Sequence, residues 1–150
     1  MSDQPSPFAP AAGAEEPPEQ RGQPLVSVVV RSMDRPSLSA ALDSIAAQDY
    51  PHIEIVLVNA LGPTHRPLPH KVGELPLRST PVEPGRLARA TAANVGLDAA
   101  RGTLLAFLDD DDVYLGGHIS KLVAALQAQP DAVATLTVGP EVMGVVPSSV

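Results

Sequence analysis

Four consecutive aspartates, Asp109 to Asp112, follow the apolar segment TLLAFL at residues 103–108. Carboxylates packed this closely repel one another unless a cation compensates their charge. Their oxygen atoms are the ligands that Mg²⁺ or Mn²⁺ takes, and a cation held there can bridge a diphosphate. The alternative is that they only stabilise the N-terminus of a following helix, but one or two aspartates would suffice for that. The run of four therefore favours a metal or phosphate site.

Three apolar segments are expected to position these aspartates. Residues 25–31 (LVSVVVR), 53–58 (IEIVLV) and 103–108 are apolar on both faces, which is typical of strands buried in a parallel sheet. A helix is expected between the first two, and its apolar face comprises Leu38, Ala41, Leu42 and Ile45. Strand, helix and strand in this order predict a right-handed βαβ unit.

Two further helices flank the third strand. The first is expected from Gly85 to Arg101, ended by Gly102, and its apolar face comprises Ala88, Ala92, Val95 and Ala99. The second is expected to begin near His118, and its inner face comprises Ile119, Leu122, Val123 and Leu126. Short strands are expected at residues 75–79 and in ATLTV at 134–138. The alternation predicts an α/β fold with a Rossmann-like, doubly wound, mostly parallel sheet, in which ligands bind at the carboxyl ends of the strands.

The composition narrows the function classes. The chain has 150 residues, enough for one compact domain, and a formal net charge of −7, which argues against binding a nucleic-acid backbone. It has no cysteine, so disulfides and thiolate metal sites are excluded. Residues 1–24 are rich in Pro, Glu and Gln and are expected to form a disordered leader before a domain at 25–150. Without a signal sequence or membrane-spanning stretch, we expect a cytoplasmic protein, associated with membranes only through a partner.

Two long segments resemble a known family. VSVVVRSMDRPSLSAALDSIAAQDYPHIEIVLVNA, starting at Val26, resembles the opening of family-two glycosyltransferases of the GT-A fold. ANVGLDAARGTLLAFLDDDDVYLGGHISKL, starting at Ala93, resembles their central segment, which ends in the D-x-D metal motif. The resemblance covers about Pro24 to Gln129 and implies a nucleotide-diphosphosugar donor held with Mg²⁺ or Mn²⁺. It also implies transfer of the sugar, with inversion, to an acceptor such as a glycan, lipid or protein.

The resemblance also implies roles for individual residues. Asp111 would be a direct metal ligand, and Asp109 and Asp110 would contact the ribose or the waters of the metal. The remaining expected donor contacts are Arg31 and Ser32 beside the nucleoside, Arg89 near a phosphate, and Asn94, which matches an asparagine that recurs in the family. No catalytic base is assigned, because the half of the domain that supplies it lies beyond the resemblance.

One departure from the family bears on the donor. Many relatives have two aspartates after the second strand, whereas this chain has Asn59 and Ala60. The carboxylate that contacts the base is therefore missing, although Asn59 can still donate and accept hydrogen bonds. A catalytically inactive nucleotide-binding or regulatory remnant of the fold is the alternative, and a module that binds a cation only for structure is a third.

Other features favour structural roles. His65 and His70 lie in a proline-rich loop, and their spacing could suit a metal, but no third ligand is evident and we expect the loop to be solvated. Asp34 is expected to start a helix, and a contact with the donor is the alternative. The apolar segments VATLTV at 133–138 and VMGVV at 142–146 need a covering surface. We therefore expect self-association or a partner chain.

Overall fold

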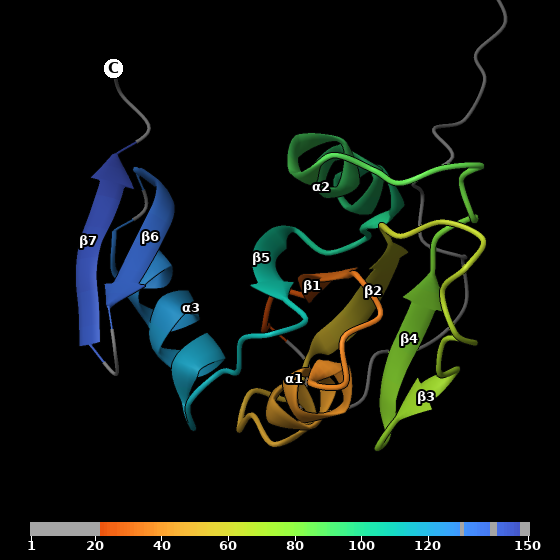
Figure 1. Cartoon of the computed structure of the whole chain (residues 1–150). Helices are drawn as coiled ribbons and strands as arrows, with labels where there is room; N and C mark the ends of the chain where they lie inside the picture. Colours follow the sequence, from red (N-terminus) through yellow and green to blue (C-terminus); the bar gives the residue numbers. More distant parts are fainter. Residues whose placement is uncertain (1–21, 130, 139–140, 148–150) are drawn as a thin grey trace, which may run out of the picture.

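A computed structural model describes residues 22–129, 131–138 and 141–147 of the chain. The chain forms a five-stranded sheet of order β3-β4-β2-β1-β5 and a separate two-stranded sheet of β6 and β7 (Figure 1). The elements are β1 Val26–Ser32, α1 Leu38–Ala46, β2 Ile53–Asn59, β3 Lys71–Val72, β4 Leu75–Ser79, α2 Arg89–Ala99, β5 Leu104–Asp109, α3 His118–Ala128, β6 Ala132–Val138 and β7 Glu141–Pro147.

The larger sheet is mostly parallel, as the sequence predicts. β1 lies at its centre and pairs in parallel with β2 on one side and β5 on the other. β4 pairs in parallel with β2, and the two-residue β3 is antiparallel to β4 at the edge. The α/β fold class is therefore confirmed, and the carboxyl ends of β1, β2 and β5 meet at one edge of the sheet.

Helices cover both faces of this sheet. Alternate residues of β1 face opposite sides, so Val28 and Val30 join the core formed with α1, whereas Val29 joins the core formed with α2. Figure 1 shows α1 and α2 on opposite sides of the sheet. Helix α3 adds Ile119 and Val123 to the core on the α1 side. The sheet is thus held between two apolar layers, which fixes the directions in which its strand ends point.

Helix α2 begins later than the sequence predicts, at Arg89 rather than Gly85. The backbone amide of Leu87 donates a hydrogen bond to the carbonyl of Ala60 at 2.9 Å, and Ala88 is extended. Residues 85–88 therefore run alongside the end of β2, and this tertiary contact overrides the helical pattern. As a result, Ala88 is exposed and does not belong to the inner face of the helix.

Two glycines near α2 allow close packing. A Cβ added at Gly96 would overlap the side chain of Val29, so the missing side chain lets the helix lie directly on the sheet. A Cβ at Gly102 would lie 2.5 Å from the carbonyl oxygen of Leu25, while the Gly102 amide donates to the Ser27 hydroxyl at 2.8 Å. Gly102 was expected to cap the helix, but the helix ends at Ala99, and Gly102 is required by its contact with β1.

The inner face of α3 is narrower than the sequence predicts. Ile119 and Val123 are buried in the core, but Leu122 and Leu126 are only partly buried. The predicted strand ATLTV is confirmed within β6, which pairs with β7 and not with the larger sheet. In Figure 1 this hairpin lies beside α3.

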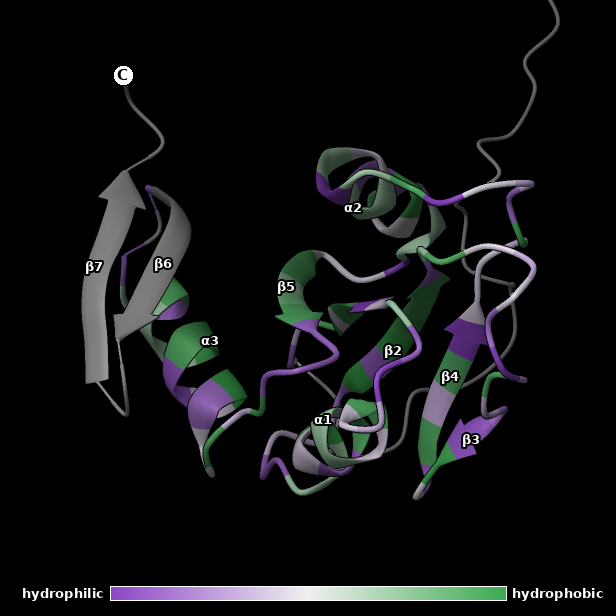
Figure 2. Cartoon of the chain, viewed as in Figure 1, coloured by the Kyte–Doolittle hydropathy of each residue, from purple (hydrophilic) through white to green (hydrophobic). Residues whose placement is uncertain are grey.

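Strand β5 forms an edge of the larger sheet and carries exposed apolar residues. Phe107 and Leu105 are 54% and 41% exposed, and Figure 2 shows the hydrophobic colouring of this strand at the sheet edge. The expected self-association or partner chain remains a prediction. Over the described part of the chain, none of the helices has the length and apolar character needed to cross a membrane. The expected leader falls mostly on residues 1–21, outside the described residues.

A buried carboxylate ties the strands together at the end of the sheet opposite the aspartates. Glu54 of β2 accepts hydrogen bonds from the Ser27 hydroxyl at 2.6 Å, the Arg101 amide at 2.7 Å and the Arg78 guanidinium at 2.8 Å. Burial alone would raise the pKa of Glu54, but these hydrogen bonds and the charge of Arg78 outweigh it and lower the pKa. Glu54 thus joins β1, β4 and the start of β5 as an ionised group.

Candidate functional site

The register of the parallel strands brings the predicted site residues together. Ser32, the last residue of β1, lies opposite Asn59 at the end of β2, and Arg31 lies opposite Asp109 at the end of β5. Carboxyl ends of parallel strands at this edge are where open α/β folds bind ligands. The four residues therefore end three adjacent strands at one edge of the sheet, but consecutive residues of a strand face opposite sides, so Arg31 and Asp109 lie on one face and Ser32 and Asn59 on the other.

A tight turn arranges the aspartates after β5. The Asp112 amide donates to the Asp109 carbonyl at 3.1 Å, and this turn brings carboxylate oxygens of Asp109, Asp111 and Asp112 within 4.8 Å of one another. Asp111 and Asp112 are exposed, and Asp109 is partly buried. Three converging oxygen ligands suit a hard divalent cation. Asp112 was not expected as a ligand, although it belongs to the same acidic run.

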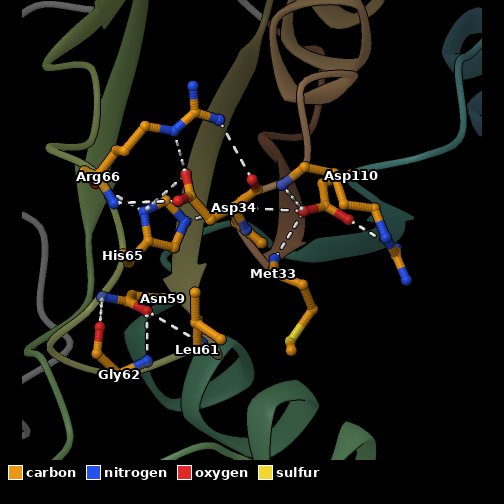
Figure 3. Close-up of polar contacts among 10 residues, drawn as sticks. Met33, Asp34, Asn59, Leu61, Gly62, His65, Arg66 and Asp110 are labelled. Carbon is orange, nitrogen blue, oxygen red and sulfur yellow. Dashed lines mark hydrogen bonds and ion pairs between the residues drawn. The ribbon is translucent and has the colours of Figure 1, made fainter.

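Asp110 faces the other way. Its carboxylate is fully buried and accepts hydrogen bonds from the Met33 amide at 2.6 Å and the Arg35 guanidinium at 2.9 Å (Figure 3). Its backbone carbonyl accepts a hydrogen bond from the Ser37 hydroxyl at 2.6 Å. Asp110 therefore anchors the loop between β1 and α1 to the end of β5. A direct contact with a donor, as the resemblance implies, would require this loop to open.

Asn59 is engaged in its own loop. Its amide oxygen accepts hydrogen bonds from the amides of Leu61 and Gly62 at 3.1 and 2.9 Å, and its Nδ2 donates to the Gly62 carbonyl at 3.0 Å (Figure 3). The side chain is 4% exposed. Asn59 thus shapes the turn after β2, and these contacts use the groups that were expected to reach a nucleobase.

The proline-rich loop packs against the end of β1. His65 was expected in a solvated loop, but its side chain is 2% exposed, and its Nε2 lies 2.7 Å from the Ser32 hydroxyl. Asp34, expected at a helix start, has a positive φ of 62° and accepts a hydrogen bond from Arg66 Nε at 2.8 Å. Helix α1 begins four residues after Asp34, so Asp34 does not start it, and His65 is not solvated. Both expectations were wrong because contacts between the two loops fix these side chains. Of the two histidines in this loop, His70 is exposed, as expected.

Three arginines neutralise the acidic turn. Arg89 Nη1 lies 3.2 Å from Asp109, Arg35 Nη1 lies 3.1 Å from Asp111, and Arg31 Nη1 lies 3.7 Å from Asp109. Sequence reasoning named Arg31 and Arg89 but missed Arg35, whose position follows from the loop that Asp110 anchors. Among the described residues, no ion pair involves Asp112.

A cavity of about 340 Å³ opens beside this cluster. Its polar wall is formed by Arg31, Arg89, Asp109 and Asp112, and its apolar wall by Val29, Ala93, Phe107 and Leu108. Arg31 is 13% exposed, and its Nε and Nη1 have no hydrogen-bond partner among the described residues. Buried donors of this kind call for an acceptor. Asn94, on the exposed side of α2, does not line the cavity.

An open α/β sheet with carboxylates and arginines at its carboxyl edge has the architecture of a ligand-binding domain of the doubly wound class. The chain belongs to glycosyl transferase family 2, whose sequence model matches residues 27–146. It is 31% identical over 103 residues to the uncharacterized glycosyltransferase YwdF of Bacillus subtilis, covering 68% of this chain and 38% of that protein. It is also 31% identical over 113 residues to the uncharacterized glycosyltransferase EpsJ of the same organism, covering 73% of this chain and 33% of that protein.

Solved structures confirm the GT-A fold. Residues 1–349 of TarS from S. aureus match with a TM-score of 0.57 and 24% identity, over 71% of this chain and 33% of that one. The mannosyltransferase PcManGT from Pyrobaculum calidifontis, solved with GDP-Man and Mn²⁺, matches with a TM-score of 0.54 and 24% identity. That match covers 73% of this chain and 34% of PcManGT. The chain therefore spans a little over a third, at most, of the length of these relatives.

Proposed function

We propose that this domain binds a nucleotide-diphosphosugar together with a divalent cation, and that it transfers the sugar when an acceptor-binding half completes it. The convergence of Asp109, Asp111 and Asp112 within 4.8 Å, at the ligand-binding edge of the sheet, is the observation that carries the proposal. Family membership supports the nucleotide-sugar donor. PcManGT, which holds GDP-Man and Mn²⁺ on the same fold, supports the pairing of such a donor with a metal.

The ligand set fits the proposed cation. All three groups are carboxylates, which suit Mg²⁺ or Mn²⁺. Two of them are exposed, so a cation bound there would still be open to water and to oxygen atoms of the donor. A cation bound there would neutralise the negative charge of the diphosphate as it leaves the sugar.

The arginines at the cavity suit the rest of the donor. Arg31 is mostly buried, and its Nε and Nη1 have no hydrogen-bond partner among the described residues, so it would donate to the nucleoside or the phosphate nearest to it. Arg89 is 75% exposed at the mouth of the cavity and would reach a phosphate. The Ser32 hydroxyl is hydrogen-bonded to His65, so Ser32 would hold the end of β1 in place and would not contact the donor. Asn94 does not line the cavity, so it would contact only a part of the donor that extends outside the cavity.

Thermal unfolding tests this proposal. The wild type is melted with UDP, GDP or dTDP, each with and without Mn²⁺, beside Asp111→Asn and the control Asp98→Asn, which changes an exposed aspartate of α2. A ligand at a hundred times its dissociation constant stabilises the fold by about 2.7 kcal/mol. We expect a Mn²⁺-dependent increase with at least one nucleotide, lost in Asp111→Asn and kept in Asp98→Asn. The absence of any such increase in a cooperatively melting wild type would refute it.

A second candidate is a domain that binds nucleotides without transferring sugar. It is favoured by Asn59, whose amide oxygen and Nδ2 are bound within the turn after β2, so that no side chain at this position is free to read the base. Isothermal titration and a donor-hydrolysis assay on the same protein separate the two candidates. Nucleotide binding without release of nucleoside diphosphate from any of several nucleotide-sugars would support the second one.

A further inference from the structure

Two exposed arginines occupy the carboxylates that a divalent cation would need. Arg89 Nη1 lies 3.2 Å from Asp109 Oδ2, and Arg35 Nη1 lies 3.1 Å from Asp111 Oδ2. Asp109 and Asp111 are two of the three aspartates whose oxygen atoms converge. The same carboxylates therefore face a choice between a guanidinium and a metal.

The two occupants compete through charge. A divalent cation among these oxygens would lie within a few ångströms of both guanidinium groups, and like charges this close repel strongly. A carboxylate oxygen that coordinates a metal at about 2.1 Å also loses much of its capacity to accept from an arginine. Binding of the cation therefore favours displacement of Arg35 and Arg89.

Both side chains are accessible to solvent, and the Arg35 guanidinium also pairs with the buried Asp110 carboxylate at 2.9 Å. Arg89 is 75% exposed and Arg35 is 42% exposed, whereas Arg31 is only 13% exposed and is held in the wall of the cavity. Departure of the Arg35 guanidinium leaves the buried Asp110 carboxylate with hydrogen bonds from the backbone amides of Met33 and Arg35. Displacement therefore leaves the loop between β1 and α1 in place.

A phosphate beside the metal is the natural destination of the displaced groups. Guanidinium groups bind phosphate oxygens through paired, charge-assisted hydrogen bonds. We propose that Arg35 and Arg89 are exchangeable counterions, which neutralise Asp111 and Asp109 when no divalent cation is bound and transfer to the diphosphate of the donor when one binds. This inference rests on the proposed function, and it assigns a donor role to Arg35, which the sequence did not indicate.

Opposite effects on metal and nucleotide binding distinguish an exchange from an ordinary contact. The proteins compared are the wild type, Arg35→Gln, Arg89→Gln and the control Arg86→Gln. Arg86 is exposed and forms no ion pair with the acidic turn in the described part of the chain, so its variant removes the same charge elsewhere. First, Mn²⁺ alone is titrated and free Mn²⁺ is followed by electron paramagnetic resonance. We expect Arg35→Gln and Arg89→Gln to bind Mn²⁺ about three- to tenfold more tightly, since each loses a competing ion pair and a repelling charge.

Second, UDP and GDP are titrated at saturating Mn²⁺, with uridine and guanosine as probes that lack phosphate. The nucleoside diphosphate that the wild type binds should bind about three- to tenfold more weakly to Arg35→Gln and to Arg89→Gln, with unchanged binding of its nucleoside. Arg86→Gln should match the wild type in both titrations.

The outcomes separate this inference from the function on which it rests. Unchanged or weaker Mn²⁺ binding by both variants overturns the exchange, even if the wild type binds nucleotide. Tighter Mn²⁺ binding with unchanged nucleotide binding overturns the transfer to the diphosphate. A wild type that binds Mn²⁺ but neither UDP nor GDP refutes the proposed function, and the Mn²⁺ titration alone then decides whether the arginines compete with the metal.

Discussion

Replacing Glu54 with Gln should destabilise the fold without touching the acidic turn. Glu54 is 5% exposed and accepts three hydrogen bonds, from Ser27, from the Arg101 amide and from Arg78. Gln keeps the shape but turns one carboxylate oxygen into a donor. If that NH₂ faces Arg78, two donors meet at a distance of 2.8 Å, and if it faces Ser27, two hydrogen bonds are lost.

The magnitude follows from these contacts. A hydrogen bond that involves a charged group contributes about 1.5–3 kcal/mol, and a buried donor left without a partner costs a similar amount. We therefore expect Glu54→Gln to lower the free energy of unfolding by about 2–3 kcal/mol at pH 7, measured by urea denaturation. Glu74→Gln is the matched control, because Glu74 is 95% exposed and its ion pair, with Lys71, lies at the surface. It should change the free energy of unfolding by less than about 0.5 kcal/mol.

The pH dependence gives an independent check. Because the pKa of Glu54 is lowered in the fold from its ordinary value of 4.5, its contribution is complete above that value and is lost as the pH falls through the folded pKa. The difference between wild type and Glu54→Gln should therefore stay constant from neutral pH down to about 5 and shrink below 4.5. A difference below about 0.5 kcal/mol at pH 7, or one that grows on acidification, would refute the reasoning.

Three further substitutions test the packing and the loops. Gly96→Ala should lower the urea midpoint, with a cost of about 1–3 kcal/mol, because the added methyl overlaps Val29; a rise would mean that helix propensity wins over packing. Asp110→Asn should lower the melting temperature by an amount equivalent to about 1–3 kcal/mol, because the buried charge that binds Met33 and Arg35 is lost. His65→Ala should lower the free energy of unfolding by about 1 kcal/mol, because the contact with Ser32 is lost. An unchanged melting temperature would show that other contacts hold the loop in place.

The fold was largely predictable from hydrophobic patterning. Strands β1 and β2 are runs of apolar residues buried on both faces, and a parallel sheet between helices is the arrangement that buries such strands. Strand β5 was expected to be buried in the same way, but it lies at the edge of the sheet, where Leu105 and Phe107 are exposed. The start of α2 was not predictable in the same way. Residues 85–88 carry a helical pattern, but the hydrogen bond from Leu87 to Ala60 joins them to a strand end distant in sequence.

The site was predictable in its location but less so in the roles of its residues. A run of aspartates after a buried strand identifies the ligand-binding edge, and Asp109 and Asp111 do converge there. The burial of Asp110, the closed turn of Asn59 and the contact between His65 and Ser32 depend on loops meeting in three dimensions. No local pattern records those meetings, and Arg35 was missed for the same reason.

The turn that follows β5 also makes four identical residues non-interchangeable. Because Asp110 is turned into the protein while its neighbours converge outside, each position in the run has its own direction. Deleting a single aspartate would leave an acidic tripeptide but shift every later residue by one place, carrying Val113 to the position of Asp112. The site therefore depends on the number of residues between the end of β5 and each aspartate, and an acidic segment of another length would not reproduce it.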